Sequence, residues 1–140
     1  MSEESTTPDL VELMRRGFEA ANRRDVDAGA SFYASDAIYE SAGLGARFEG
    51  LAAIREFLGD FGGAYDEFGL EAEEILDLGN GVTFAVVDQK GRPHGSSGEV
   101  QMRYAAVAIW VEGMIERFTT YTDIDEARAA AERLAEERGS

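Results

Sequence analysis

The order of residue patterns along this chain limits its fold more than any other feature of the sequence. Three segments repeat apolar residues at helical spacing: residues 8–22, 25–33 and 51–60. Between the second and the third, residues 37–41 have the pattern of a strand, and residues 43–47 have the pattern of a loop. Alternation of apolar and polar residues dominates only after the third segment. The sequence therefore predicts helices first and a group of strands afterwards.

The second part of the chain has the pattern of consecutive hairpins. A change of phase at Glu73-Glu74 predicts a bulge in the first long strand, and Gly79-Asn80-Gly81 is typical of a tight hairpin turn. Asp123 or Asp125 can cap a final helix. Helices followed by an antiparallel meander predict an α+β fold and not a parallel α/β fold. The expected strands are residues 68–78, 82–88, 99–111 and 114–122, with a long connection at 90–98.

Length and composition favour one compact domain. The chain has 140 residues, of which 44% are hydrophobic, and this is enough to bury one core. We expect a disordered N-terminus at residues 1–7, one domain over residues 8–124, and a helix over residues 125–140 that is part of the domain or appended to it. The sequence has no cysteine and a single histidine, so neither a disulfide nor a zinc site is expected. No metal or other cofactor is predicted.

Two further features of the sequence concern its location in the cell. No run of about 18 consecutive apolar residues, as a membrane span requires, occurs in the chain. The first ten residues, MSEESTTPDL, are acidic and polar, unlike a secretion signal. We therefore expect a cytoplasmic protein.

The chain is strongly acidic. Asp and Glu number 28 against 13 Lys and Arg, which gives a net charge of −15. Phosphate backbones and anionic membranes would be repelled, so no nucleic-acid partner and no membrane partner is expected. A cationic partner is one explanation of the acidity. We favour a solubilising surface, because the acids are scattered over every element.

Four stretches of the chain match the pattern of one known family. They are RRGFEAANRRDVDAGASFYASDAIYES, FEGLAAIREFL, the Gly-Asn-Gly hairpin and MRYAAVAIWVEGMIERFTTYTD. Together they resemble SnoaL-like proteins of the nuclear-transport-factor-2-like superfamily, from Leu10 to Asp123. The resemblance implies a cone-shaped, curved antiparallel sheet wrapped around three N-terminal helices, with an added C-terminal helix and a ligand pocket inside. The fold hosts isomerases, cyclases, hydrolases and non-catalytic binders, so the resemblance is specific for fold and not for function.

The resemblance also implies catalytic positions, but this chain lacks the residues that the chemistry needs. Ketosteroid isomerases use a tyrosine, an aspartate base and a protonated aspartate, whose positions fall near Gly17, on Ser41 and on Ala106. SnoaL-type cyclases place a histidine and an aspartate at Ala106 and Thr120, and limonene-epoxide hydrolases need a carboxylate at about Thr120. Neither a serine alone nor a threonine serves as a general base near neutral pH, so no catalytic residue is predicted. Gly17 sits mid-helix at a cost of about 1 kcal/mol against alanine, which indicates close packing or an opened space beneath it.

The resemblance and the strand alternation together predict the lining of the pocket. If Ala106 faces inward, every second residue of its strand faces inward as well. Small side chains at Ala106 and Ala108 would leave room for a mostly apolar molecule, oriented by a few hydroxyl groups. The alternative is that these residues pack as an ordinary core. The predicted ligand-binding residues are Tyr39, Ser41, Tyr104, Ala106, Ala108, Trp110, Phe118 and Thr120.

Two functions are compatible with such a pocket. The first is an apolar cup that binds a small hydrophobic molecule without catalysis. The second is an isomerase, cyclase or hydrolase acting on a polyketide-, steroid- or terpene-like substrate, with a relocated acid at Asp36, Glu40 or Asp88. A carboxylate inside the cup with a raised pKa would favour the enzyme, and hydroxyl groups alone would favour the binder.

The pattern of the strands also predicts a homodimer. Residues 82–87 and 104–111 are largely apolar on both faces of the sheet, although the helices and the cup can cover only one face. An exposed patch of this kind is unusual on a soluble monomer, so we expect a second copy to cover the outer face. The residues expected to need this cover are Ala85, Val87, Ala105, Val107 and Ile109.

Overall fold

The computed structural model describes residues 9–41 and 45–139, which form four helices and six strands. The helices are α1 (Leu10–Asn22), α2 (Val26–Ala30), α3 (Leu51–Gly63) and α4 (Ile124–Arg138). The strands are β1 (Tyr33–Ser41), β2 (Ala46–Glu49), β3 (Tyr65–Gly79), β4 (Val82–Pro93), β5 (Val100–Val111) and β6 (Met114–Tyr121). The disorder predicted for residues 1–7 lies outside the described residues.

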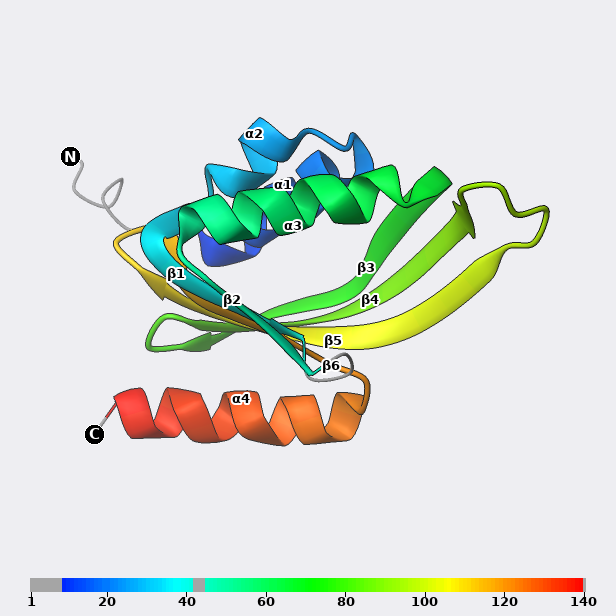
Figure 1. The fold of residues 1–140 in the computed structure, drawn as a ribbon. Helices are drawn as coiled ribbons and strands as arrows, with labels where there is room; N and C mark the ends of the chain where they lie inside the picture. The colour runs from blue at the N-terminus through cyan, green and yellow to red at the C-terminus, as the bar shows by residue number, and fades with distance from the viewer. Residues whose placement is uncertain (1–8, 42–44, 140) are drawn as a thin grey trace.

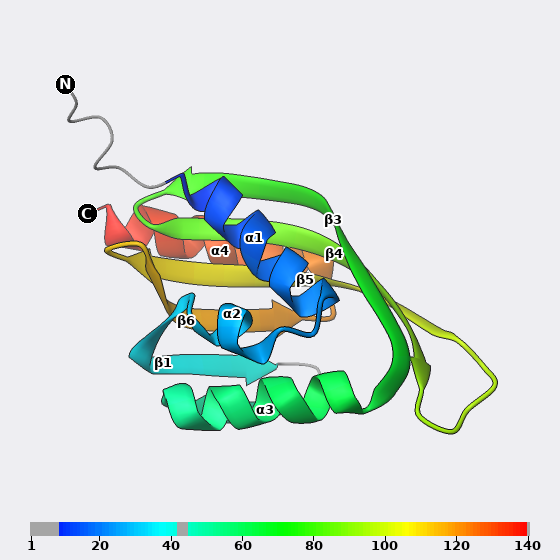
Figure 2. The same cartoon turned by 90° about the horizontal axis from the view of Figure 1, so that it is seen from above.

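The strands form one curved sheet whose two faces are covered by different helices. The strand order is β2-β1-β6-β5-β4-β3. Helices α1, α2 and α3 lie over one face, here called the inner face, and α4 lies along the other, the outer face (Figure 1, Figure 2). The expected α+β class is confirmed, with a curved sheet, three N-terminal helices on its inner face and a C-terminal helix.

One pair of strands departs from the antiparallel pattern. Strands β1 and β6 run parallel, whereas the other neighbouring strands are antiparallel. The whole meander separates these two strands along the chain, so no tight hairpin imposes an antiparallel arrangement on them. Their register places Tyr39 beside Phe118 and Ser41 beside Thr120. Residues from the two ends of the domain thus meet in the middle of the sheet.

The segment around residue 33 differs from the expectation. Helix α2 has Asp25 as its N-cap, as expected, but it ends at Ala30 instead of near Tyr33. Strand β1 starts at Tyr33, which pairs with Ile115 of β6. In addition, the Ile115 amide donates a 2.7 Å hydrogen bond to the Phe32 carbonyl. Pairing with a distant strand therefore overrides the helical spacing of this segment.

Two strands extend into segments that were expected to be loops. Strand β2 occupies Ala46–Glu49, where it pairs with residues 38–41 of β1. A strand of four residues is too short to show a clear alternation. Residues 43 and 44, also assigned to this loop, lie outside the described residues. Similarly, β4 continues to Pro93, because residues 89–91 pair with both β3 and β5 and the last two residues pair with β3.

The bulge predicted within β3 and the tight turn predicted at its end both occur. Its register with β4 shifts between Ala72 and Glu74, at the position of the expected bulge. The turn Gly79-Asn80-Gly81 joins β3 to β4 with a positive φ at every residue. A Cβ at Gly81 would lie 2.6 Å from the Trp110 carbonyl oxygen, so the turn requires glycine there for space as well as for φ.

The two faces of the sheet belong to two separate hydrophobic clusters. The inner cluster packs Ala106, Trp110 and Phe118 with side chains of α1 and α3. The outer cluster packs Phe84 and Val107 against the buried alanines of α4. Both faces are therefore covered, at least in part, by the protein's own helices.

This coverage changes the argument for the predicted homodimer. Ala85 and Val87 belong to the inner cluster. The register pairs Ala85 with an inward-facing residue of β5, and cross-strand partners share a face of the sheet. Ala105 and Val107 belong to the outer cluster, under α4. Of the residues expected to need a partner chain, only Ile109 is partly exposed. The homodimer itself stays a prediction.

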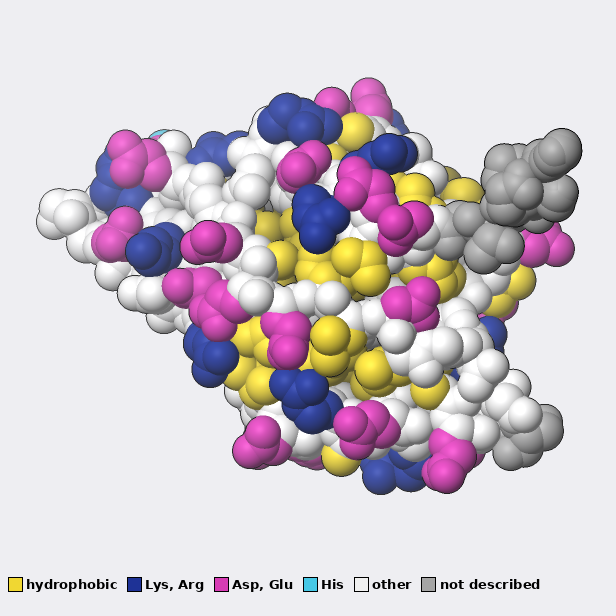
Figure 3. Space-filling view, turned by 180° about the vertical axis from the view of Figure 1, so that it is seen from behind, with side chains coloured by type: hydrophobic (Ala, Val, Ile, Leu, Met, Phe, Trp, Pro, Cys, Tyr) yellow, Lys and Arg dark blue, Asp and Glu magenta, His cyan; other side chains and the backbone are white. Residues whose placement is uncertain are grey.

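The described surface carries its charges in a mixed arrangement. On the face shown in Figure 3, Asp and Glu side chains are spread among arginines, with hydrophobic side chains between them. None of the helices in residues 9–41 and 45–139 combines the length and the hydrophobicity needed to cross a membrane.

Candidate ligand cavity

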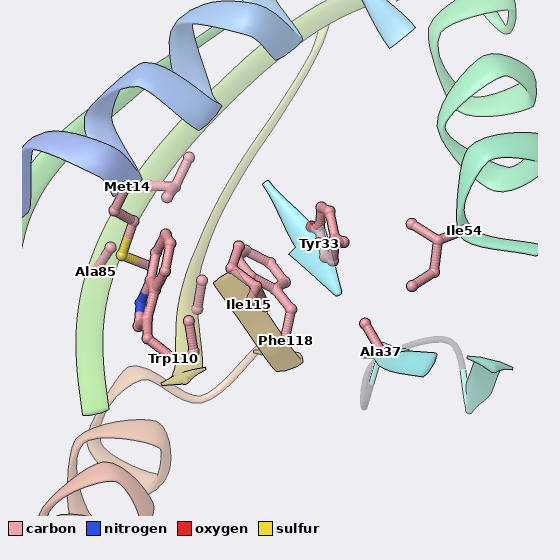
Figure 4. Close-up of a cluster of buried hydrophobic side chains, with 11 residues drawn as sticks. Met14, Tyr33, Ala37, Ile54, Ala85, Trp110, Ile115 and Phe118 are labelled. Atoms are coloured by element: carbon pink, nitrogen blue, oxygen red, sulfur yellow. The ribbon is translucent and has the colours of Figure 1, made fainter. Parts of the chain in front are cut away.

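A cavity of about 130 Å³ lies between the inner face of the sheet and helices α1, α2 and α3. All three helices and every strand except β2 contribute side chains to its wall. Figure 4 shows the hydrophobic cluster that supports it, with Met14 of α1 next to Trp110 of β5. Phe118 of β6 lies between Trp110 and Tyr33 of β1 in this view. The cavity wall and the inner core are one continuous structure.

Aromatic rings form the part of the wall where β1 and β6 meet α3. Tyr39 stacks on Phe118 with ring centroids 5.2 Å apart. It also packs against Phe57 of α3, at a centroid distance of 4.9 Å. Phe57 in turn packs against Phe61, at 5.9 Å. These ring contacts hold Tyr39 in place and give the cavity an uncharged wall.

Glycines in the helices provide the space. Gly17 of α1 lines the cavity, and a Cβ added there would meet only Phe32, at 3.9 Å. Gly29 of α2 and Gly62 of α3 line the cavity as well. Of the two explanations considered for Gly17, the structure supports an opened space and not close packing.

Four of the eight predicted ligand-binding residues line the cavity: Tyr39, Tyr104, Trp110 and Phe118. Ala106 and Ala108 face the same side of the sheet but are fully enclosed in the inner core and do not reach the cavity. These alanines therefore add no space to this cavity, which lies beneath the helix glycines instead, and their role in ligand binding stays a prediction.

The remaining predicted residues, Ser41 and Thr120, do not line the cavity either. They are brought together with Ala106, because Ser41 pairs with Thr120 and Thr120 pairs with Ala106 across three neighbouring strands. These are the positions at which the resemblance implies catalytic groups. The structure thus gathers them in one row of the sheet, where they carry no carboxylate and no imidazole.

Two polar residues of the wall were not predicted. Gln89 of β4 is only 7% exposed and lines the cavity. It continues the inward alternation of Ala85 and Val87, but it lies one residue beyond the predicted end of this strand at residue 88. Tyr33 also lines the cavity, and it was missed because its segment was assigned to a helix.

Three tyrosines bring hydroxyl groups to the cavity. None of the hydroxyls of Tyr33, Tyr39 and Tyr104 forms a hydrogen bond with a described residue. Burial raises the pKa of Tyr104 to about 12. Burial also raises the pKa of Tyr33 and of Tyr39, and the neighbouring phenols add to the effect. At neutral pH the three hydroxyls are therefore uncharged donors or acceptors and not bases.

Among the described residues, the acid that reaches the cavity is Asp25, at its exposed rim, where it caps α2. The acids considered for a relocated catalytic role are Asp36, Glu40 and Asp88, and none of them lines the cavity. Glu40 lies on the outer face, where it forms a 2.7 Å ion pair with Arg117. The three acids named for the alternative function thus lie outside the described wall of this cavity.

The single histidine also lies away from the cavity. His94 follows β4, and its Nδ1 is 2.8 Å from a carboxylate oxygen of Asp66, with its side chain 80% exposed. Within residues 9–41 and 45–139, no three His, Asp or Glu side chains are grouped as metal ligands. Apart from Arg24 and Asp25, the described wall of the cavity therefore offers apolar contact and neutral hydrogen bonding.

Comparisons with known proteins agree with this architecture. The family model of the SnoaL-like domain matches residues 14–118. No curated protein shows a significant match to the chain.

Three solved structures illustrate the shared fold. A protein of ketosteroid isomerase-like fold from Catenulispora acidiphila, in complex with trimethylamine, is 13% identical, with a TM-score of 0.74 over 86% of this chain and 92% of that one. An NTF2-like protein of unknown function from Burkholderia pseudomallei is 17% identical, with a TM-score of 0.73 over 89% and 98%. A candidate SnoaL-like polyketide cyclase from Shewanella denitrificans is 11% identical, with a TM-score of 0.69 over 91% and 99%.

At these identities the structural likeness shows the fold alone. The family model, in contrast, covers most of the chain, from the middle of α1 into β6. The chain therefore belongs to the SnoaL-like domain family, within the nuclear-transport-factor-2-like proteins of ketosteroid isomerase-like fold.

Proposed function

We propose that this protein binds a small, neutral, mostly apolar molecule in its cavity and has no catalytic acid or base there. This proposal rests on the composition of the cavity wall. It consists of aromatic and aliphatic side chains, helix glycines, three uncharged phenols and the amide of Gln89, with Asp25 and Arg24 as its charged residues. A wall of this kind holds an apolar guest and orients it by a few hydrogen bonds.

The size of the cavity limits the guest. About 130 Å³ is comparable with the engineered cavity of about 150 Å³ that holds benzene. A single-ring compound therefore fits this volume, and a polyketide or a steroid would have to extend out of the cavity or displace its wall. The alternative function, an isomerase, cyclase or hydrolase, has neither the space for such substrates nor a described acid inside the cavity to act on them. We expect no isomerisation of Δ5-3-ketosteroids and no opening of limonene epoxide above background.

One structural neighbour supports the idea of a small guest. The Catenulispora acidiphila protein was solved with trimethylamine, a molecule smaller than a benzene ring. A fold of this kind thus accommodates a small organic molecule.

The test uses toluene as a neutral, apolar probe, with binding measured by calorimetry. The parent should bind toluene, and Gly17→Leu should abolish binding, because the new side chain occupies the cavity. Gly59→Leu is the matched control, since Gly59 lies on the exposed side of α3 and has open space around it. Absence of toluene binding to the parent, or equal binding by both leucine variants, would overturn the proposal.

A further inference from the structure

Gln89 brings an amide to the cavity wall from the inner face of β4. The residue is 7% exposed and lines the cavity. Its cross-strand partners are Leu70 on β3 and Met102 on β5. Neither partner has a side chain that forms a strong hydrogen bond, so the amide has no polar neighbour across either strand.

The amide of Gln89 faces open space and not the protein interior. It forms no hydrogen bond with any residue in 9–41 or 45–139. Every fully enclosed side-chain nitrogen or oxygen in that part of the chain does have a partner. The amide atoms must therefore border a space, and the space beside this residue is the cavity. An amide that borders the cavity can form hydrogen bonds with a guest that offers a matching donor and acceptor.

Neutral hydroxyls accompany this amide. Tyr104 stands opposite Val87, two positions from Gln89 on β4, so both polar side chains occupy the same face of the sheet. Tyr33 and Tyr39 add two more hydroxyls that have no hydrogen bond to a described residue. Each of these groups can donate or accept, and none carries a charge at neutral pH.

We infer that Gln89 determines which molecules the cavity accepts, and that its ligand is a neutral single-ring carboxamide or lactam. The inference rests on the proposed function, because it names the class of guest for the same cavity. A glutamine amide presents a carbonyl oxygen and an NH₂ group side by side, and a second amide can pair with both at once. A hydrocarbon pairs with neither group, and a carboxylate offers acceptors only. The ring of the guest fills the remaining apolar space.

The test compares benzamide with toluene, two probes with the same ring, on three proteins by calorimetry. The parent should bind benzamide at least about tenfold more tightly than toluene, as expected for hydrogen bonds made in a buried site. Gln89→Met keeps the length of the side chain and removes the amide, so the ratio of the benzamide and toluene affinities should fall toward one. Gln101→Met is the matched control, because Gln101 is exposed on β5 and bonds to Asp88. It should keep the preference of the parent.

The outcomes separate this inference from the proposed function. If the parent binds both probes equally, or if Gln89→Met keeps the preference for benzamide, Gln89 is not the determinant, although the cavity still binds apolar molecules. If Gln89→Met loses toluene binding as well, the residue supports the structure of the wall and does not select the ligand. If neither probe binds to the parent, both proposals are wrong.

Discussion

The indole nitrogen of Trp110 donates a 2.9 Å hydrogen bond to the hydroxyl of Thr83, a residue that is completely buried on the neighbouring strand β4. Trp110 itself is 3% exposed and lines the cavity. The bond therefore holds in place one of the largest side chains of the wall. It satisfies a buried donor that has no access to bulk water.

Thr83→Val should test this bond with little change of shape. The variant removes the acceptor and leaves the buried indole N–H of Trp110 without its partner, so we expect a loss of about 1–3 kcal/mol of stability in urea unfolding. Trp110 is the single tryptophan, and its fluorescence should shift as well. Thr83→Ser keeps the acceptor and should keep the emission of the parent. Unchanged stability and unchanged emission in Thr83→Val would show that the bond contributes nothing.

Gly17→Ala should stabilise the protein. Alanine is favoured over glycine inside a helix by about 0.5–1 kcal/mol, and the nearest atom to the new Cβ would be 3.9 Å away, on Phe32. Gly59→Ala, on the exposed side of α3, measures the stability gained by replacing glycine with alanine in a helix, without a change in the cavity. Both variants should unfold at a higher urea concentration, and only Gly17→Ala should weaken the binding of toluene. Destabilisation by Gly17→Ala would mean that α1 packs closely at this position.

The ion pair of Glu40 should stabilise the fold at neutral pH, and this stabilisation should be lost at low pH. A hydrogen bond from Arg117, supported by the charges of Arg117 and Arg47, lowers the pKa of Glu40 below 4.5 despite its partial burial. A carboxyl group with a lowered pKa in the folded state stabilises above pH 4.5, and this contribution is lost as the pH falls through the folded value. Glu40→Gln should therefore cost up to about 1 kcal/mol at pH 7. The difference from the parent should shrink as the pH falls below 4.5.

The control for this pH series is Glu49→Gln. Glu49 pairs with Arg47 at 2.8 Å, but its side chain is 65% exposed, so its removal should have a smaller effect at pH 7. A Glu40→Gln variant that differs from the parent by the same amount at pH 3 and at pH 7 would contradict the assignment to charge.

The predicted homodimer needs a revised test. Val107 lies under α4, so Val107→Arg would disturb the fold itself. A partner on the outer face would have to use the groove beside α4, whose wall includes Ile109, Tyr121 and Leu134. We expect light scattering to show a dimer that added salt strengthens, because salt screens the repulsion between two acidic chains. Ile109→Arg should reduce it to a monomer. A monomeric parent at micromolar concentration, or an unchanged dimer mass in the variant, would defeat this prediction.

Features that depend on a few neighbouring residues were predicted well. The Gly79-Asn80-Gly81 turn and the bulge at Glu73-Glu74 occur where expected, and Asp25 and Asp123 cap their helices. In each case the cause is local, since a positive φ or a side chain that bonds to a nearby amide decides the conformation. The resemblance, which places Ala106 inward, together with the alternation of β5 also placed Tyr104 and Trp110 on the side of the cavity.

The site was predicted only in part, because its wall combines residues from distant segments. Tyr33 was assigned to a helix, and pairing with Ile115 of β6 makes it part of a strand instead. Gln89 lay beyond the expected end of β4, and that strand is extended by its pairing on both sides. Neither residue is recognisable as part of a cavity until the helices are placed over the sheet.

The α+β class and the order of the elements follow from the residue patterns alone, because periodicity and turn chemistry are properties of short stretches of chain. Three features follow only from the packing of the whole chain: β1 runs parallel to β6, α4 covers Val107, and the open space lies beneath Gly17 and not at Ala106. These features depend on which distant elements pack together. A cavity is the volume left where their side chains fail to meet, and no local pattern of residues specifies that volume.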